Sequence, residues 1–219
     1  MLDAIVEQLL LILRGLTTTL SISVLSFLVG LGLGIPLAFM RAYGSRPLQV
    51  FVDLFEKVFR GIPELVLMLL FFYGVGFYFR FPFKIAFFTA VFALGMRSAA
   101  NQSQIFRGAI RGVGEEQFVA ARSLGLSRLK SIVYVLIPQV FIFSAPGMGS
   151  EYALLVKDSS YSWVITVPDM MEYSDRIRKA TSDLVTPYVI AAFLYILLTF
   201  PIATWLDTWG SRKKKKLGL

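Results

Sequence analysis

The 219-residue sequence contains no cysteine and no histidine. Disulfides, thiolate nucleophiles, imidazole bases and metal sites built from Cys or His are therefore excluded, and with them most catalytic chemistry. Charge is also scarce, because only 16% of the residues are charged whereas 56% are hydrophobic. This balance is too apolar for a soluble domain of this length and is typical of a membrane protein.

The sequence instead has long intervals with few charged residues. A helix needs roughly 20 apolar residues to cross a bilayer, and five intervals are long enough. They predict an all-α, polytopic membrane protein with a single transmembrane domain over 1–219. The first interval is too long for a signal peptide, so we expect it to be retained. The expected spans lie at about 15–40, 58–79, 85–106, 131–157 and 184–206.

Lysine and arginine are unevenly distributed along the chain, which carries a net charge of +8. The segments 41–60 and 107–130 and the tail 211–219 hold most of these residues. Because basic loops stay on the cytoplasmic side, five spans with this pattern predict an external N-terminus and a cytoplasmic C-terminus. In a soluble chain such a charge would suggest nucleic-acid binding; here we expect contact with membrane lipid and none with nucleic acid.

Small residues mark one face of the first span, where Gly30, Gly34 and Ala38 recur every four residues. This spacing lets another helix approach closely, so we expect ordinary helix packing there. The chain has no internal repeat of 20 to 50 residues, and its span number is odd. A transport-sized pathway would therefore need a partner copy.

The loop 107–130, between the third and fourth spans, predicts an ordered helical elbow. A short helix is expected from Glu115 to Leu124, with acids at its N-terminus and Gly125 as its C-cap. Ser127 can cap the next helix. The alternative is an amphipathic connector lying on lipid headgroups.

Here the sequence resembles the inner-membrane permease subunits of ATP-binding-cassette (ABC) importers for polar amino acids, of the histidine, arginine and glutamine type. Their elbow reads E-A-A, three residues, G, nine residues, then I-x-L-P, and other segments read R-G-x-P, I-x-R-G-A-I and L-x-K-D-S/T-S. In this sequence the elbow pattern is matched by Val119-Ala120-Ala121, Gly125 and 135–138. The R-G-x-P, I-x-R-G-A-I and L-x-K-D-S/T-S patterns are matched by 60–63, 105–110 and 155–160, respectively. Val119 replaces the family's glutamate.

The resemblance implies a permease subunit in a prokaryotic plasma (inner) membrane, with no catalytic residues and no metal. The implied partners are ABC ATPase subunits, a second permease in a homodimer or with a paralogue, an external substrate-binding protein and the amino acid. The chain needs no cofactor, since ATP and Mg²⁺ would be bound by the ATPase; indeed it has no G-x-x-x-x-G-K-S/T phosphate loop. The expected ATPase contacts are Glu115, Glu116, Ala120, Ala121 and Gly125.

Polar residues inside the spans are the candidates for the substrate pathway, because they are costly in lipid. In the third span Arg97, Asn101 and Gln104 share one helical stripe, and Glu151 and Asp158 form a second in the fourth span. The resemblance adds weight to Gln104 and Asp158, and Ser159 completes the candidate set.

Two questions about this pathway stay open in the sequence. Arg97 either contacts substrate or simply neutralises Glu64 or Glu151. The family commonly has glutamate at the position of Gln104, so its absence speaks against a strongly cationic substrate.

The segment 168–183 predicts an external helix capped by Asp169. It is either a solvated face or, as the resemblance implies, a surface that meets the external binding protein.

Other function classes are an ion-driven secondary carrier or channel, a structural scaffold, and a hydrolase using Ser159 or Ser160 with Lys157. The hydrolase is disfavoured because neighbouring residues on a helix point about 100° apart.

Overall fold

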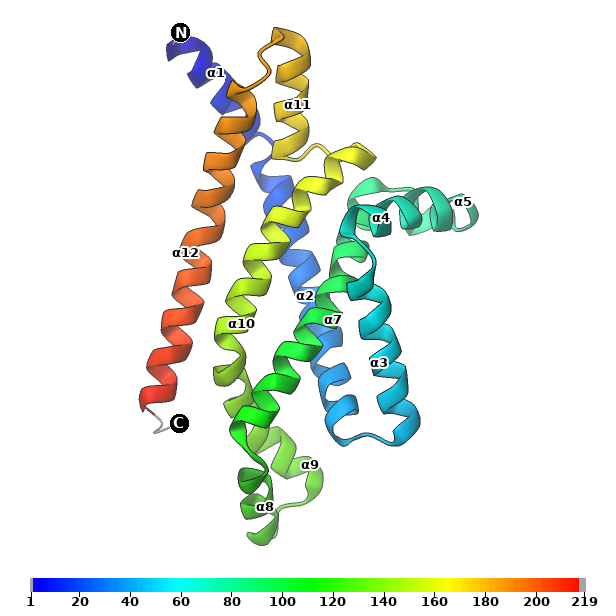
Figure 1. The fold of residues 1–219 in the computed structure, drawn as a ribbon, viewed down its shortest axis with the longest axis vertical. Coiled ribbons are helices and arrows are strands. Elements are labelled where there is room, and N and C mark those ends of the chain that lie inside the picture. The colour runs from blue at the N-terminus through cyan, green and yellow to red at the C-terminus, as the bar shows by residue number, and fades with distance from the viewer. Residues whose placement is uncertain (1, 217–219) are drawn as a thin grey trace.

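The computed structural model describes residues 2–216 as an elongated bundle of helices. No strand occurs in this range, so the all-α prediction is confirmed. Four long helices run lengthwise and pack side by side (Figure 1). They are α2 (Leu16–Tyr43), α7 (Ala86–Val113), α10 (Ile137–Asp158) and α12 (Thr186–Lys216).

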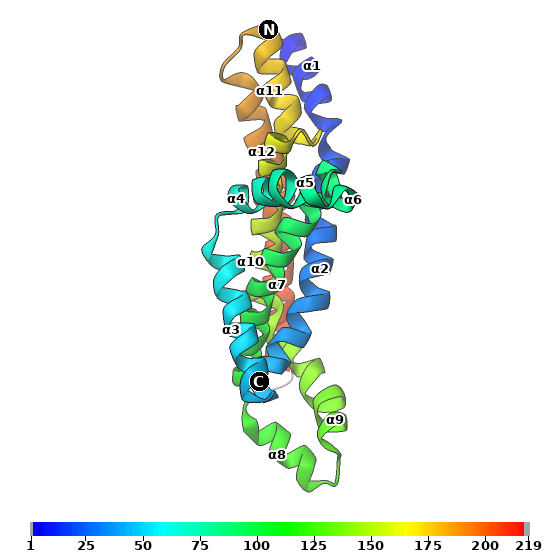
Figure 2. The same cartoon turned by 90° about the vertical axis from the view of Figure 1, so that its right-hand side faces the viewer.

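Shorter helices lie at the two ends and along one side of the bundle. At one end α1 (Leu2–Leu13) packs against α11 (Met170–Thr181), and at the other α8 (Glu115–Ser123) and α9 (Arg128–Lys130) form the elbow (Figures 1 and 2). The others are α3 (Arg46–Gly61), α4 (Glu64–Leu69), η1 (Leu70–Val75), α5 (Gly76–Tyr78), α6 (Arg80–Phe83), η2 (Ser131–Leu136) and η3 (Ser159–Ile165).

Helices α2 and α7 pack in close contact, and glycine makes this approach possible. A Cβ atom on Gly30 would lie 2.4 Å from Nε2 of Gln102, and one on Gly34 would lie 2.9 Å from Cβ of the same residue. Any larger residue would force the helices apart. The prediction that this small-residue face packs on another span is confirmed.

The segment predicted as one span at 58–79 is not a continuous helix. Helix α3 ends at Gly61, and α4 begins at Glu64 after a bend of 100°. Pro63 explains the break, because a residue before proline avoids the helical region, and Ile62 is extended with φ −95° and ψ 129°. Helix α3 therefore runs along the bundle, whereas α4, η1 and α5 cross it (Figure 2).

Among the described residues three helical segments are long and apolar enough to cross a membrane: Asp3–Tyr43, Arg128–Ile165 and Thr186–Lys215. The bent pair α3 and α4–α5 could supply a fourth. Helix α7 has 28 residues, about 42 Å, but its polar stripe keeps it outside this group. The structure thus has three to four apolar spans, whereas the composition of the sequence predicted five.

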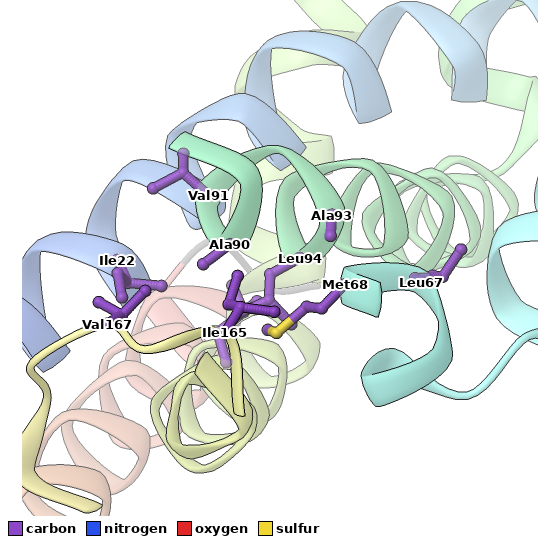
Figure 3. Packing of buried hydrophobic residues seen from close by; sticks show 10 residues of the cluster. Ile22, Leu67, Met68, Ala90, Val91, Ala93, Leu94, Ile165 and Val167 are labelled. Carbon is purple, nitrogen blue, oxygen red and sulfur yellow. The ribbon is translucent and has the colours of Figure 1, made fainter. Parts of the chain in front are cut away.

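A buried apolar cluster holds α4 against the long helices (Figure 3). Leu67 and Met68 of α4 pack with Leu94 of α7 and Ile165 of η3, and all four side chains are almost fully buried. This packing fixes Glu64, at the start of α4, beside the polar side of α7.

The corner between η3 and α11 buries a carboxyl group. Asp169 is fully buried and caps α11 as predicted, with Oδ1 accepting the Glu172 N–H at 2.8 Å. Its backbone lies so close to Gly15 that a Cβ there would be 2.4 Å away. Burial raises the pKa of Asp169 to about 7, although the cap and Ser162 act in the opposite direction.

We predict that stability falls as pH rises because of this group. Between pH ~4, the usual aspartate pKa, and 7, folded Asp169 keeps a proton that the unfolded chain releases, so folding weakens by at most about 1.4 kcal/mol per pH unit. Asp169→Asn keeps the cap and should remove this decline in denaturant unfolding of detergent-solubilised protein. Asp183→Asn, at an exposed helix cap, should retain it. Identical profiles for wild type and Asp169→Asn would contradict the prediction.

Candidate functional site

Arg97 lies between two carboxylates from different helices. Its Nη1 is 2.7 Å from Oδ2 of Asp158, the last residue of α10, and its Nη2 pairs with Oε1 of Glu64 at the start of α4. All three side chains are mostly buried. Of the two carboxylates considered as partners of Arg97, Glu64 pairs with it, and the second ion-pair partner is Asp158 and not Glu151. The ion pairs join α4, α7 and α10 at one point.

Asn101 continues the same stripe one turn along α7. Its Nδ2 donates to Oε2 of Glu151 at 3.1 Å, and its Oδ1 accepts from Nε of Arg60 at 2.9 Å. Glu151 is buried, and its Oε1 makes no close hydrogen bond among the described residues, although the Ser98 hydroxyl lies near the same carboxylate. One amide thus holds a cation from α3 and a carboxylate from α10 on its two sides.

A second polar centre forms around Glu56 of α3, whose side chain is only 4% exposed. Arg107 binds its two oxygens with both Nη atoms, at 3.0 and 3.3 Å, and Ser103 donates at 2.8 Å. Gln104 donates from Nε2 to Oε2 at 2.9 Å. The cluster borders an open cavity of about 490 Å³, lined by Asp53, Glu56, Lys57, Arg60, Gly61, Gln104 and Arg107.

The structure separates Gln104 from Asp158, the two pathway candidates to which the resemblance gave most weight. Arg97, the partner of Asp158, and Gln104 are seven residues apart on α7, about 10 Å along its axis, and Gln104 faces Glu56 instead. Ser159 also lies elsewhere, because it is fully buried and donates to the Val156 carbonyl at 2.7 Å. Arg97, Asn101, Glu151 and Asp158 are therefore the candidates that share one site.

Sequence reasoning missed Glu56 and the role of Arg60. A signal was available, because Val52 and Glu56 are four residues apart in an amphipathic helix and lie on its buried face. A carboxylate on such a face needs a partner. The identity of the partner, Arg107, depends on α3 folding back beside α7 (Figure 2).

The elbow has the predicted local structure. Gly125 follows α8 with φ +86°, and the Leu126 N–H donates to the Ala121 carbonyl at 3.2 Å, which closes the helix end. Ser127 caps α9 by accepting the Lys130 N–H at 3.3 Å. The elbow projects beyond the end of the bundle in both views (Figures 1 and 2).

The candidate coupling residues do not all face outward. Glu116, Ala120 and Gly125 are exposed, but Ala121 is only 3% exposed. The side chain of Glu115 lies outside what the structure describes. Large apolar side chains are also exposed on the elbow, including Val119 and Leu124, the latter at 84%. The elbow thus exposes apolar side chains beside charged ones such as Glu116 and Arg122.

Comparison with known proteins assigns the chain. The family model for the binding-protein-dependent transport system inner membrane component matches residues 30–215. The chain belongs to this family. This inner membrane component is a multi-pass transport subunit and not an enzyme, and the assignment decides against an ion-driven carrier, a scaffold and a hydrolase.

Curated relatives and solved structures agree with the family assignment. The arginine transport system permease protein ArtQ of Bacillus subtilis is 33% identical over 97% of this chain and 96% of its own. The histidine/lysine/arginine/ornithine transport system permease protein HisM of Escherichia coli K12 is 30% identical over 85% and 82%. A crystal structure of an amino acid ABC transporter with histidines superposes with TM-score 0.84, at 30% identity and over 95% and 97% of the chains. The MetNI methionine ABC transporter, at TM-score 0.77 and 17% identity over 92% and 95%, shares the fold.

We predict that the Glu56–Arg107 pair stabilises this inner membrane component. Glu56→Ala leaves the largely buried Arg107 without its carboxylate and should cost about 3 to 5 kcal/mol of unfolding free energy. Asp53→Ala on the same helix removes a carboxylate whose pair with Arg41 is more exposed, and should cost about 1 kcal/mol or less. Equal losses in denaturant unfolding would contradict a buried pair.

Proposed function

We propose that this chain forms the membrane pathway of an ABC importer for a polar amino acid, with ATP and Mg²⁺ bound by a separate ATPase. Relatives whose names specify arginine and histidine transport, together with the solved amino acid transporter, support this proposal. The observation that carries it is the pair of opposite charges held on the two sides of Asn101.

The spacing of these charges suits the main-chain groups of an amino acid. Two hydrogen bonds of 2.9 and 3.1 Å joined by the Asn101 amide place Arg60 and Glu151 up to about 8 Å apart. An ammonium and a carboxylate on one carbon, each with a hydrogen bond of about 2.8 Å, span a similar distance. Arg60 would bind the substrate carboxylate, and the unpartnered Oε1 of Glu151 would accept from its ammonium group.

The charges next to this pair favour a cationic or polar side chain. The carboxylates of Glu64, Glu151 and Asp158 lie around Arg97, and Arg60 lies across Asn101 from Glu151, so three carboxylates face two guanidinium groups. The resulting surplus of negative charge attracts a guanidinium or imidazolium group. It offsets the missing carboxylate at Gln104, which on sequence grounds spoke against such a substrate.

We predict that Arg60→Gln and Glu151→Gln each weaken substrate binding. Losing one directly bonded group should cost about 1 to 3 kcal/mol, which corresponds to a roughly 5- to 150-fold rise in the substrate concentration for half-maximal uptake. Uptake into proteoliposomes and basal ATP hydrolysis should be measured together, and basal hydrolysis should not change. Arg46→Gln, which makes the same charge change as Arg60→Gln but at the start of α3, is the control for Arg60→Gln. A half-maximal concentration unaltered in both variants would refute the substrate site.

The second part of the proposal concerns topology and assembly. If the polar helix α7 is a fifth crossing beside the three apolar spans and the bent pair, an external N-terminus puts α11 outside and the elbow inside. These two elements lie at opposite ends of the bundle in Figure 1. Exposed aromatic side chains on η1, α5 and their flanks provide a surface for lipid or for a second permease chain. They include Tyr73, Phe77, Tyr78, Phe79 and Phe81.

ATPase coupling is assigned to the outer side of the elbow. Ala120, Leu124 and Gly125 are exposed there, and the short helix is closed at its end by Gly125. A short helix with exposed apolar side chains such as Val119 and Leu124 could enter a groove on the ATPase. On the external side α11 is the proposed contact for the substrate-binding protein.

Single cysteines test both assignments, because the native chain has none. Arg176→Cys, on the exposed side of α11, should react with an impermeant thiol reagent on intact cells. Ala120→Cys should react only in inside-out vesicles, and more slowly when the ATPase is bound. Ala120 reacting on intact cells would overturn the topology, and unchanged reactivity with and without ATPase would overturn the coupling role.

A further inference from the structure

The final turns of α12 form a basic surface that the transport pathway does not use. An open cavity of about 550 Å³ lies there, lined by Trp209, Arg212, Lys213 and Lys215. No acidic residue is among these lining side chains, so the cavity has the charge expected for an anion site.

The opposite face of the same turns is fixed on α10. A Cβ on Gly210 would lie 2.9 Å from Cβ of Ala145, which shows how closely the helices approach. One turn further, Nζ of Lys214 lies 4.5 Å from the ring centroid of Phe143. This packing turns Trp209 and Lys213 away from α10.

An apolar stripe leads into the basic surface from the membrane side. Ile202, Trp205 and Trp209 are spaced by three and four residues and share a helix face, and all three are exposed. Tryptophan side chains favour the level of the lipid headgroups, and basic residues just beyond that level attract anionic lipids. The face thus offers an apolar track for an acyl chain and cations for a phosphate.

We propose that the surface formed by Trp209, Arg212, Lys213 and Lys215 binds the phosphodiester headgroup of an anionic phospholipid in the cytoplasmic leaflet. This inference rests on the proposed cytoplasmic position of the C-terminus. A soluble phosphate anion shares the headgroup's charge but would not use the stripe formed by Ile202 and Trp205. The elbow projects beyond the end of α12 in both views, which leaves this surface nearer the bilayer than the ATPase contact (Figures 1 and 2).

The test measures binding of fluorescent phosphatidylglycerol to the detergent-purified permease–ATPase complex. Arg212→Gln, Lys213→Gln and Lys215→Gln combined should weaken binding at least ten-fold, and added salt should weaken wild-type binding. The matched control is the combination of Arg46→Gln, Arg111→Gln and Lys130→Gln, which removes the same charge from exposed positions. It should change the affinity less than two-fold.

Competition identifies the source of the phosphate. Unlabelled phosphatidylglycerol should displace the probe, whereas phosphatidylcholine and millimolar glycerol phosphate should not. Displacement by glycerol phosphate would assign the site to a soluble anion. Equal losses of affinity in the two triple variants would show that binding depends only on the net charge of the protein. Loss of ATPase co-purification in the tail variant without loss of lipid binding would make it a protein contact. Each of these outcomes overturns the proposal, and none depends on substrate uptake, so failure of the transport assignment would be seen separately.

Discussion

The cost of placing charge inside an apolar bundle governs the arrangement of this permease. A lone charge at such depth is expensive, so each one must find a partner on another helix. Arg97 finds Glu64 and Asp158, and Glu56 finds Arg107. These pairs bring α3 and α4 to α7 and α7 to α10, so the ion pairs also determine which helices border the proposed substrate pathway.

The polar groups of the proposed pathway are not all paired. Glu56 accepts from three side chains and has no capacity left for a ligand. Glu151 keeps one oxygen without a partner, and Arg60 is exposed. A buried polar atom without a hydrogen bond is rare, and it leaves a favourable interaction for a substrate to supply. The two centres therefore differ: the one at Glu56 is fully paired and joins α3 to α7, whereas the one at Asn101 is the centre proposed to bind substrate.

Local features of the fold could be predicted from sequence, and those that depend on helix pairing could not. Gly125, Ser127 and Asp169 act through neighbouring backbone groups, so their capping roles follow from nearby residues. The polar stripe of α7 likewise follows from helical periodicity. In contrast, the apolar stretch through 58–79 concealed the break at Pro63, and the separation of Gln104 from Asp158 depends on where α3 lies.

The continuity of α7 has a mechanical consequence. This one helix runs from the Arg97 site to Val113, which is separated from α8 only by Gly114, and α2 is pressed against it where neither Gly30 nor Gly34 has a Cβ. The two helices therefore resist independent bending. Arg97 is 16 residues, about 24 Å, from the elbow, so a tilt of about 10° pivoting there would move the guanidinium about 4 Å. Such a stiff lever would separate Arg97 from Asp158 unless α10 moved with it, which links the opening of the ion pair to the angle of the elbow.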